Sequence, residues 1–333
     1  MLSQVRKKIS RFPYTADPAA GGENFERIFD LLDEKAIEST VLEAGHRVSY
    51  IVSQGFIEEV CELRNIGESV RCIVEKFEYI RCAWFENHSW HEVSAQCVDD
   101  IVAQIKILQL PSDHTINTAA VLLSPTFVGT VFHEFAHALE VDHAPQALHV
   151  IGKDVFGYGF GKEISVFEDP TCKSFGQHKY SDTGCLQKRR MLVDHGVLKA
   201  VLGNYETGEN LYVGISNESK LSPRTVCLKV EGPCSSIPLN EGILVLGGEV
   251  TSLLMRPCDM ILWIDTVEIC AFRESRLLSH NRIPIKRAFR FCDMLNHIEF
   301  VDCNIILPSV GGFCQKGSSL IRSTQYSRFA YWK

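Results

Sequence analysis

The chain has little that would suit a nucleic-acid-binding or membrane protein. Its formal net charge is −7, so it has no basic excess to attract phosphate backbones or anionic lipids. No apolar run approaches the ~20 residues that a membrane-spanning helix needs. Internal repeats and low-complexity segments are also missing. We therefore expect neither nucleic acid nor a membrane among the partners of this protein.

Paired cysteine motifs are lacking as well, although the chain has 13 cysteines. No CxxC pair occurs, which argues against a zinc finger or a thioredoxin-type motif. Residues 1–11 carry several charges and no apolar stretch, so we expect no secretory signal peptide. The cysteines are odd in number and scattered, which favours a reducing compartment. We expect a cytoplasmic protein.

The composition is that of a globular protein, with 333 residues, 45% hydrophobic and 23% charged. Residues 1–115 predict a small N-terminal α/β module, with helices over 24–34 and 94–108 and strands over 42–52, 56–63, 69–74 and 79–84. Residues 116–333 predict a catalytic region with one motif-bearing helix and a mainly antiparallel β domain. Short apolar runs interrupted by turn residues indicate strands there, at 164–167, 197–202, 225–230, 243–246 and 260–272. The expected fold class is α+β.

The segment His133–His137 reads His-Glu-Phe-Ala-His and is the strongest functional signal in the chain. Two histidines four residues apart on a helix lie on one face, about one turn apart. That geometry can hold two imidazole nitrogens at the roughly 2.0–2.1 Å that a zinc ion needs. Glu134, beside the first histidine, can accept a proton from water at the metal. The motif predicts a zinc hydrolase; the alternative is a buried amphipathic helix with two satisfied histidines.

The residues before the motif favour the zinc interpretation. The apolar run 119–123 predicts a buried strand, Ser124 suits a helix N-cap and Pro125 suits the first helical position. The helix should then run through the motif and end near Val141. Because most of it is uncharged and should be buried, a charged Glu134 would be costly there without a partner such as a metal with its water.

Two neighbouring patterns are weaker. His143 stands six residues after His137, nearly where metzincins have a third histidine, but Glu140 occupies the position of the glycine that lets their helix bend. We expect His143 to lie off the metal-binding face. The segment 157–162 is rich in glycine, yet a phosphate-binding loop would need glycine at 156 and Ser or Thr at 163. A glycine-rich turn is the better interpretation.

Several stretches between about residues 119 and 320 follow the order and spacing of one known family. They are Leu122–Pro125 with Gly129, Thr130, His133 and Glu134; Leu139, Glu140 and Asp142; Glu168–Thr171; Ser181–Gly184 followed by Leu192–Leu198; Leu246–Val250; and Gly312–Gly317. Taken together, they resemble the TldD/PmbA family of zinc metallopeptidases. The chain is short for this family, and the shortfall lies in the N-terminal module.

The resemblance implies a ligand set that local spacing leaves open. In the family, two motif histidines and a late cysteine hold the zinc, which implies His133, His137 and Cys314 here, with Glu134 as the base. On spacing alone Cys314 would be a free cysteine. The family also implies a dimer, commonly with a related TldE/PmbA-like subunit that lacks the motif. Because this chain has the motif, it would be the catalytic half.

We therefore predict a cytoplasmic, Zn²⁺-dependent peptidase that hydrolyses small or unfolded peptides, modified precursor peptides among them. One rival is a non-catalytic subunit that uses the same fold to bind a partner. A second is a metzincin-like peptidase with His143 as the third ligand. A third is a purely structural zinc site, closed by a fourth protein ligand.

Overall fold

Sheet dominates the part of the chain that the structure describes. The computed structural model describes residues 47–53, 56–62, 66–74, 77–85, 107, 110–112, 120–142, 145–157, 159–172, 181, 185–213, 221–307, 312–316 and 319–333. Within these residues extended sheet is accompanied by few helices, so the fold class is α+β, as predicted.

Two hairpins account for the described N-terminal residues. Strand β1 (Arg47–Ser53) pairs with β2 (Phe56–Glu62), and β3 (Ile66–Val74) pairs with β4 (Phe77–Phe85), both antiparallel. The four strands expected there are thereby confirmed. Apart from Ile107, the helices expected over 24–34 and 94–108 lie outside the described residues, so the helical half of the N-terminal module stays a prediction.

A six-stranded sheet carries the C-terminal cysteine segment at one edge. Its order is β17 (Gly312–Lys316), β18 (Ser319–Tyr326), β11 (Cys227–Glu231), β6 (Ser165–Glu168), β7 (Arg190–Asp194) and β8 (Val197–Leu198). The pairs are antiparallel except β11 with β18. A separate short pair is formed by β9 (Leu211–Val213) and β10 (Leu221–Pro223).

A seven-stranded sheet forms the other large layer. Its order is β12 (Cys234–Ser235), β16 (Ile298–Val301), β19 (Phe329–Trp332), β5 (Val121–Leu123), β13 (Glu241–Leu254), β14 (Ile261–Arg273) and β15 (Arg276–Arg290). The long strands β13, β14 and β15 form an antiparallel meander, whereas β5–β13 and β12–β16 are parallel. The region is thus mainly antiparallel, as expected, with parallel pairs where distant segments meet.

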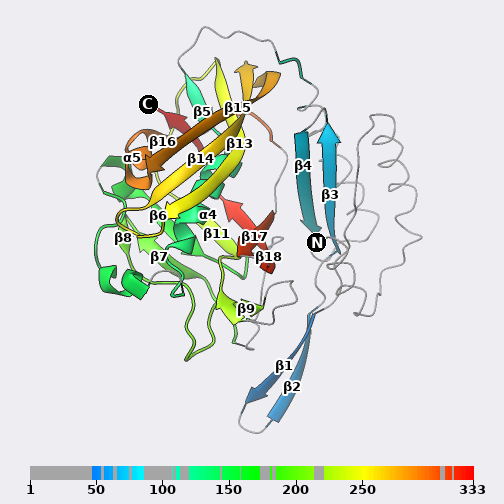
Figure 1. Cartoon of the computed structure of the whole chain (residues 1–333), viewed down its shortest axis with the longest axis vertical. Helices are drawn as coiled ribbons and strands as arrows, with labels where there is room; N and C mark the ends of the chain where they lie inside the picture. Colours follow the sequence, from blue (N-terminus) through cyan, green and yellow to red (C-terminus); the bar gives the residue numbers. More distant parts are fainter. Residues whose placement is uncertain are drawn as a thin grey trace, which may run out of the picture.

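Helix α4 (Pro125–His137) lies between the two sheets, against β13 on one side and against β18 and β11 on the other (Figure 1). Its start is as predicted. The Ser124 hydroxyl accepts the Phe127 N–H at 3.0 Å and donates to the Leu246 carbonyl at 2.5 Å. The N-cap therefore fixes the helix to β13 as well as starting it.

The end of α4 differs from the expectation. The helix stops at His137 rather than near Val141, with Ala138 as its C-cap. Beyond the cap, Glu140 forms a bridge with Leu202, and the Val141 N–H donates to the Leu202 carbonyl at 3.0 Å. Pairing with the 202 segment thus replaces the helical hydrogen bonds, and Glu140 turns back beneath the helix instead of continuing it.

The side of α4 away from the motif histidines is held by an aromatic cluster. Phe135 stacks on Phe291 of α5 (Phe291–Asn296) at 4.8 Å between ring centroids, and Phe132 meets the same ring edge-on at 5.3 Å. Burying each such ring contributes roughly 1.5–3 kcal/mol. On another side, a Cβ at Gly129 would lie 2.8 Å from Cβ of Gln325. Glycine there lets α4 approach β18 closely.

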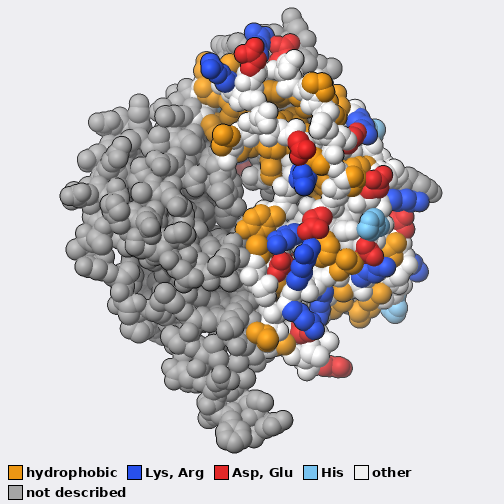
Figure 2. All heavy atoms as spheres, turned by 180° about the vertical axis from the view of Figure 1, so that it is seen from behind, with side chains coloured by type: hydrophobic (Ala, Val, Ile, Leu, Met, Phe, Trp, Pro, Cys, Tyr) orange, Lys and Arg blue, Asp and Glu red, His pale blue; other side chains and the backbone are white. Residues whose placement is uncertain are grey.

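Two short 3₁₀ helices follow α4, η2 (Pro145–Val150) and η3 (Gly159–Glu163). The glycine-rich segment falls in η3 and the turn before it, in agreement with the turn interpretation. Among the described residues, no helix is long and apolar enough to cross a membrane. On the face shown in Figure 2, basic and acidic side chains are intermixed over the described surface, and neither sign gathers into a patch.

Candidate metal centre

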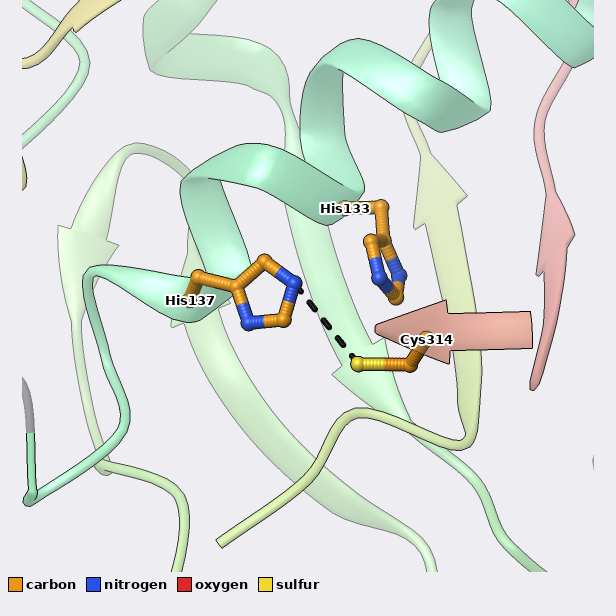
Figure 3. Close-up of side chains that lie close together, drawn as sticks. All are labelled: His133, His137 and Cys314. Carbon is orange, nitrogen blue, oxygen red and sulfur yellow. Dashed lines mark hydrogen bonds between the residues drawn. The ribbon is translucent and has the colours of Figure 1, made fainter. Parts of the chain in front are cut away.

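His133, His137 and Cys314 converge on one point, although Cys314 is far from the helix in sequence (Figure 3). The histidines come from α4 and the cysteine from the edge strand β17. His137 Nε2 lies 3.6 Å from Cys314 Sγ, and the ligand atoms of all three residues lie within 4.8 Å of one another. All three side chains are buried, Cys314 completely.

The arrangement fits a small, nitrogen- and sulfur-binding cation. Bonds of about 2.0–2.1 Å to nitrogen and about 2.3 Å to sulfur in a tetrahedron need ligand atoms roughly 3.5 Å apart. The distance of 3.6 Å between His137 Nε2 and Cys314 Sγ matches this separation. The imidazole rings meet edge-to-face with centroids 4.7 Å apart, so their nitrogens can aim at a common point. Three protein ligands leave a tetrahedral position free for water or substrate.

Both imidazoles are oriented by a neighbouring polar side chain. His137 Nδ1 lies 3.0 Å from Oε1 of the fully buried Glu140, and this carboxylate fixes the ring with its Nε2 toward Cys314. His133 Nδ1 lies 3.1 Å from the Gln325 amide of β18. Glu140 follows His137 by three residues, a spacing at which two side chains can meet at the end of a helix.

The two histidines have opposite tendencies toward protonation. Burial, the nearby His137 and the Arg224 guanidinium hold the pKa of His133 well below its ordinary value, so its ring stays neutral. Burial would also lower the pKa of His137, but its hydrogen bonds and charge interactions with Cys314 and Glu140 raise it well above the ordinary value. A cation would therefore have to displace a proton from His137.

A buried arginine adjoins the cysteine. Arg224 is 1% exposed, and its Nη1 lies 3.9 Å from Cys314 Sγ. Its Nε has no hydrogen-bond partner among the described residues. A buried guanidinium is costly unless an anion compensates it. A thiolate ligand at Cys314, as metal binding would require, is such an anion.

Glu134 lies on the same helix, one residue after the first histidine, and is half-buried. Ser252 of β13 donates a hydrogen bond to Glu134 Oε2 at 2.5 Å. One carboxylate oxygen is thereby fixed to the opposite sheet. The sequence predicts a partner for the Glu134 carboxylate, and Ser252 supplies one.

A second buried carboxylate lies behind the site. Glu168 is fully buried, and its Oε1 accepts the N–H groups of Val226 at 2.7 Å and Cys227 at 3.0 Å. Its Oε2 has no partner among the described residues. Burial raises the pKa of Glu168 to about 7; the two N–H groups oppose the rise, and the negative charges of Glu140 and Asp169 add to it.

Glu168→Gln should change how stability depends on pH. The folded state holds the proton up to about pH 7, whereas an ordinary glutamate loses it near 4.5. The stability this proton provides is therefore complete below about pH 4.5 and is lost as pH rises through 7. The loss amounts to about 3 kcal/mol of unfolding free energy. Denaturant unfolding between pH 5 and 8 should show this decline in the wild type and a flatter profile in the variant.

Glu163→Gln is the matched control, because Glu163 is exposed and its replacement should leave the wild-type profile unchanged. An equal decline in Glu168→Gln and the wild type would contradict a neutral Glu168 in the fold.

The structure brings together the three candidate ligands named from the sequence, whereas Glu134 lies on the same helix with its carboxylate hydrogen-bonded to Ser252. His143 lies outside the described residues. The sequence argument missed the supporting residues Glu140, Arg224, Ser252 and Gln325. A carboxylate three residues after a helical histidine was a visible signal for Glu140. The others come from distant strands and loops, and nothing local marked them.

Part of the chain is similar to known metallopeptidases. Residues 116–232 match the model of the PmbA/TldA metallopeptidase C-terminal domain. The chain is 30% identical over 93 residues to a metalloprotease of Archaeoglobus fulgidus, and 37% identical over 90 residues to one of Methanocaldococcus jannaschii. These alignments span 22% and 20% of the two relatives, and 28% and 26% of this chain.

The fold resembles that of a family member with a solved structure. TldE of Thermococcus kodakarensis superposes with a TM-score of 0.54 at 12% identity, over 96% of this chain and 75% of that one. At such low identity the likeness concerns the fold alone. Two of the relatives are named metalloproteases, and in this chain His133, His137 and Cys314 could bind a metal ion.

Proposed function

We propose that this chain is a zinc-dependent peptidase in which His133, His137 and Cys314 hold the metal and Glu134 acts as the base. The convergence of two helical imidazoles and a distant thiol carries this proposal, and Glu134 is assigned as the base from its place next to His133 on α4. Two nitrogens and one sulfur are a donor set that suits Zn²⁺. When bound, zinc supplies Lewis-acid chemistry, polarising a carbonyl and acidifying water.

The chain's own residues move the protons. Glu134, with one oxygen held by Ser252, accepts a proton from the attacking water and passes it to the leaving amine. Glu140 and Gln325 hold the imidazoles in place, and Arg224 stabilises the negative charge at Cys314.

The substrate class we propose is a small or unfolded peptide, including modified precursor peptides. Among the described strands β17 lies at an edge of its sheet and also carries Cys314. An extended peptide that adds to this edge through main-chain hydrogen bonds would bring its carbonyl groups beside the metal ligands. Recognition through the main chain requires an unfolded substrate and tolerates many sequences.

The assembly and location follow from the family resemblance. We propose a dimer, with a related TldE/PmbA-like subunit or with a second copy, in which this chain is the catalytic half. The likeness of fold to TldE supports a partner of that kind. The odd number and scattered positions of the cysteines support the cytoplasm as the compartment.

Metal removal and restoration test the proposal. Stripping the full-length chain with a zinc chelator should abolish hydrolysis of an unstructured peptide mixture, followed by mass spectrometry, and about one equivalent of Zn²⁺ should restore it. Hydrolysis that persists without metal would contradict the proposed mechanism. If the zinc-loaded chain cleaves nothing, alone or with a TldE/PmbA-like subunit, the non-catalytic rival is favoured.

A further inference from the structure

The six-stranded sheet has a second face, directed away from α4, that the proposed peptidase site does not use. Side chains alternate between the faces of a strand. On β11, Leu228 and Val230 join the core beneath α4, so Lys229 points to the other face. On β18, Gln325 reaches His133, so its neighbour Tyr326 points away from the metal centre.

Charged and aromatic groups meet on this outer face. Lys229 Nζ lies 2.9 Å from Asp169 Oδ2 and 5.9 Å from the centre of the Tyr326 ring. Beside them, the chain turns after β6 and is anchored to β11. The Asp169 N–H donates to the Cys227 carbonyl at 2.8 Å, and the Cys172 N–H donates to the Asp169 carbonyl at 3.0 Å. These two bonds tie the turn that carries Cys172 to the strand that carries Cys227.

The Cys172 sulfur is surrounded by hydrogen-bonding groups. The thiol of Cys227, the Lys229 ammonium and the Tyr326 hydroxyl are all its hydrogen-bonding neighbours. Cys172 is partly exposed, whereas Cys227 is fully buried. A small solute can therefore reach Cys172, whereas Cys227 is accessible only to neighbouring side chains.

These contacts make Cys172 acidic. The Cys227 hydrogen bond and the Lys229 charge lower the pKa of Cys172 to about 6, although burial opposes them. In contrast, burial raises the pKa of other described cysteines, namely Cys185, Cys234, Cys258, Cys270, Cys292 and Cys303. At neutral pH Cys172 is thus largely thiolate, the form that reacts with oxidants.

We propose that Cys172 and Cys227 are a peroxide-sensitive thiol pair that closes into an intramolecular disulfide. The Cys172 thiolate attacks one oxygen of hydrogen peroxide, the O–O bond breaks, and the leaving hydroxide takes up a proton to become water. Cys172 is now a sulfenic acid. The Cys227 sulfur then attacks the Cys172 sulfur, the S–O bond breaks, and the hydroxide leaves with the Cys227 proton as a second water. Two thiols and one peroxide thus become one disulfide and two waters.

Peptide mapping tests the pair in the full-length protein. After brief treatment of the reduced, zinc-loaded chain with a few equivalents of hydrogen peroxide, remaining thiols are blocked and the digest is analysed by mass spectrometry. We expect a Cys172–Cys227 cross-linked peptide that is absent in Cys172→Ser. In Cys227→Ser, a sulfenic acid should be trapped at Cys172 by dimedone. The control Cys303→Ser should retain the cross-link.

A rate measurement on the wild type covers the case in which a variant misfolds. Cys303 is partly exposed like Cys172, but burial raises the pKa of its thiol. At pH 6 iodoacetamide should alkylate Cys172 at least about tenfold faster than Cys303, once the lower nucleophilicity of the more acidic thiolate is allowed for. Equal rates, or a peroxide cross-link between other cysteines, would overturn the proposal. Neither readout depends on peptidase activity.

Discussion

Glu134→Gln is expected to lower kcat for peptide hydrolysis by about 10²–10⁴-fold, while the zinc content stays at that of the wild type. Glutamine has nearly the shape of glutamate and can keep the contact with Ser252, but it cannot accept the proton of the attacking water. The metal ligands lie on the other side chains, so the metal should remain. Steady-state hydrolysis and metal analysis of the same preparation measure both quantities.

Ser252→Ala is the matched companion to this variant. It keeps the Glu134 carboxylate but removes the hydrogen bond that fixes one of its oxygens at 2.5 Å. A hydrogen bond to a charged group contributes about 1.5–3 kcal/mol, so a loss of roughly tenfold or somewhat more in kcat is expected, with metal retained. If the Glu134→Gln variant keeps the wild-type kcat, Glu134 is not the base. Zinc loss in Ser252→Ala would mean that the hydroxyl supports the whole site and not the base alone.

Local sequence was enough to predict the helix that carries the motif. The Ser124 side chain caps the first turn, and Pro125 suits the first helical position because its nitrogen has no N–H to satisfy. Both effects act within the helix start and do not depend on distant residues. Strands β6, β11, β13 and β14 were predictable for a similar reason, since short apolar runs ended by turn residues have few other folds available. The strand expected over 197–202 extends only over Val197–Leu198. The i, i+4 spacing of His133 and His137 also sufficed to place both rings on one face of the helix.

What local sequence could not predict is set by contacts between distant segments. Helix α4 ends at His137 because the following residues pair with the 202 segment, and propensity alone would have continued it to Val141. The same pairing buries Glu140 against His137. Arg224 reaches Cys314 across the fold. Arg224 and Cys314 are far apart in sequence, so the spacing of residues carries no sign of their contact, whereas Glu140 follows His137 by only three residues.

Cys314 shows the difference between the two kinds of inference. Its position after a glycine and a phenylalanine has no metal-binding spacing, and only the family pattern suggested it as a ligand. In the structure its sulfur is directed at His137 from an edge strand paired with β18. The β17–β18 hairpin and the close approach of β18 to Gly129 of α4 bring this sulfur to the histidines. The site is therefore assembled by sheet topology and not by a local motif.

Replacing the proposed ligands should separate the competing ligand sets. Cys314→Ala and His133→Ala are each expected to weaken zinc binding by more than about 100-fold, because even outer partners of a ligand cost about 10–100-fold. His143→Ala should keep one zinc per chain. Dialysis against a competing chelator followed by elemental analysis measures the retained metal. Cys303→Ala, which removes a thiol away from the site, is the control and should bind like the wild type.

The reverse pattern would identify a different enzyme. If His143→Ala loses the metal while Cys314→Ala retains it, the ligand set is that of a metzincin, and Cys314 is not a ligand. The end of α4 argues against this outcome. A metzincin bend must bring the third histidine back to the metal, but here the chain after His137 uses Glu140 to hold the second histidine and then pairs with the 202 segment. The group that meets the second histidine there is a carboxylate, which supports Cys314 of β17 as the proposed third donor.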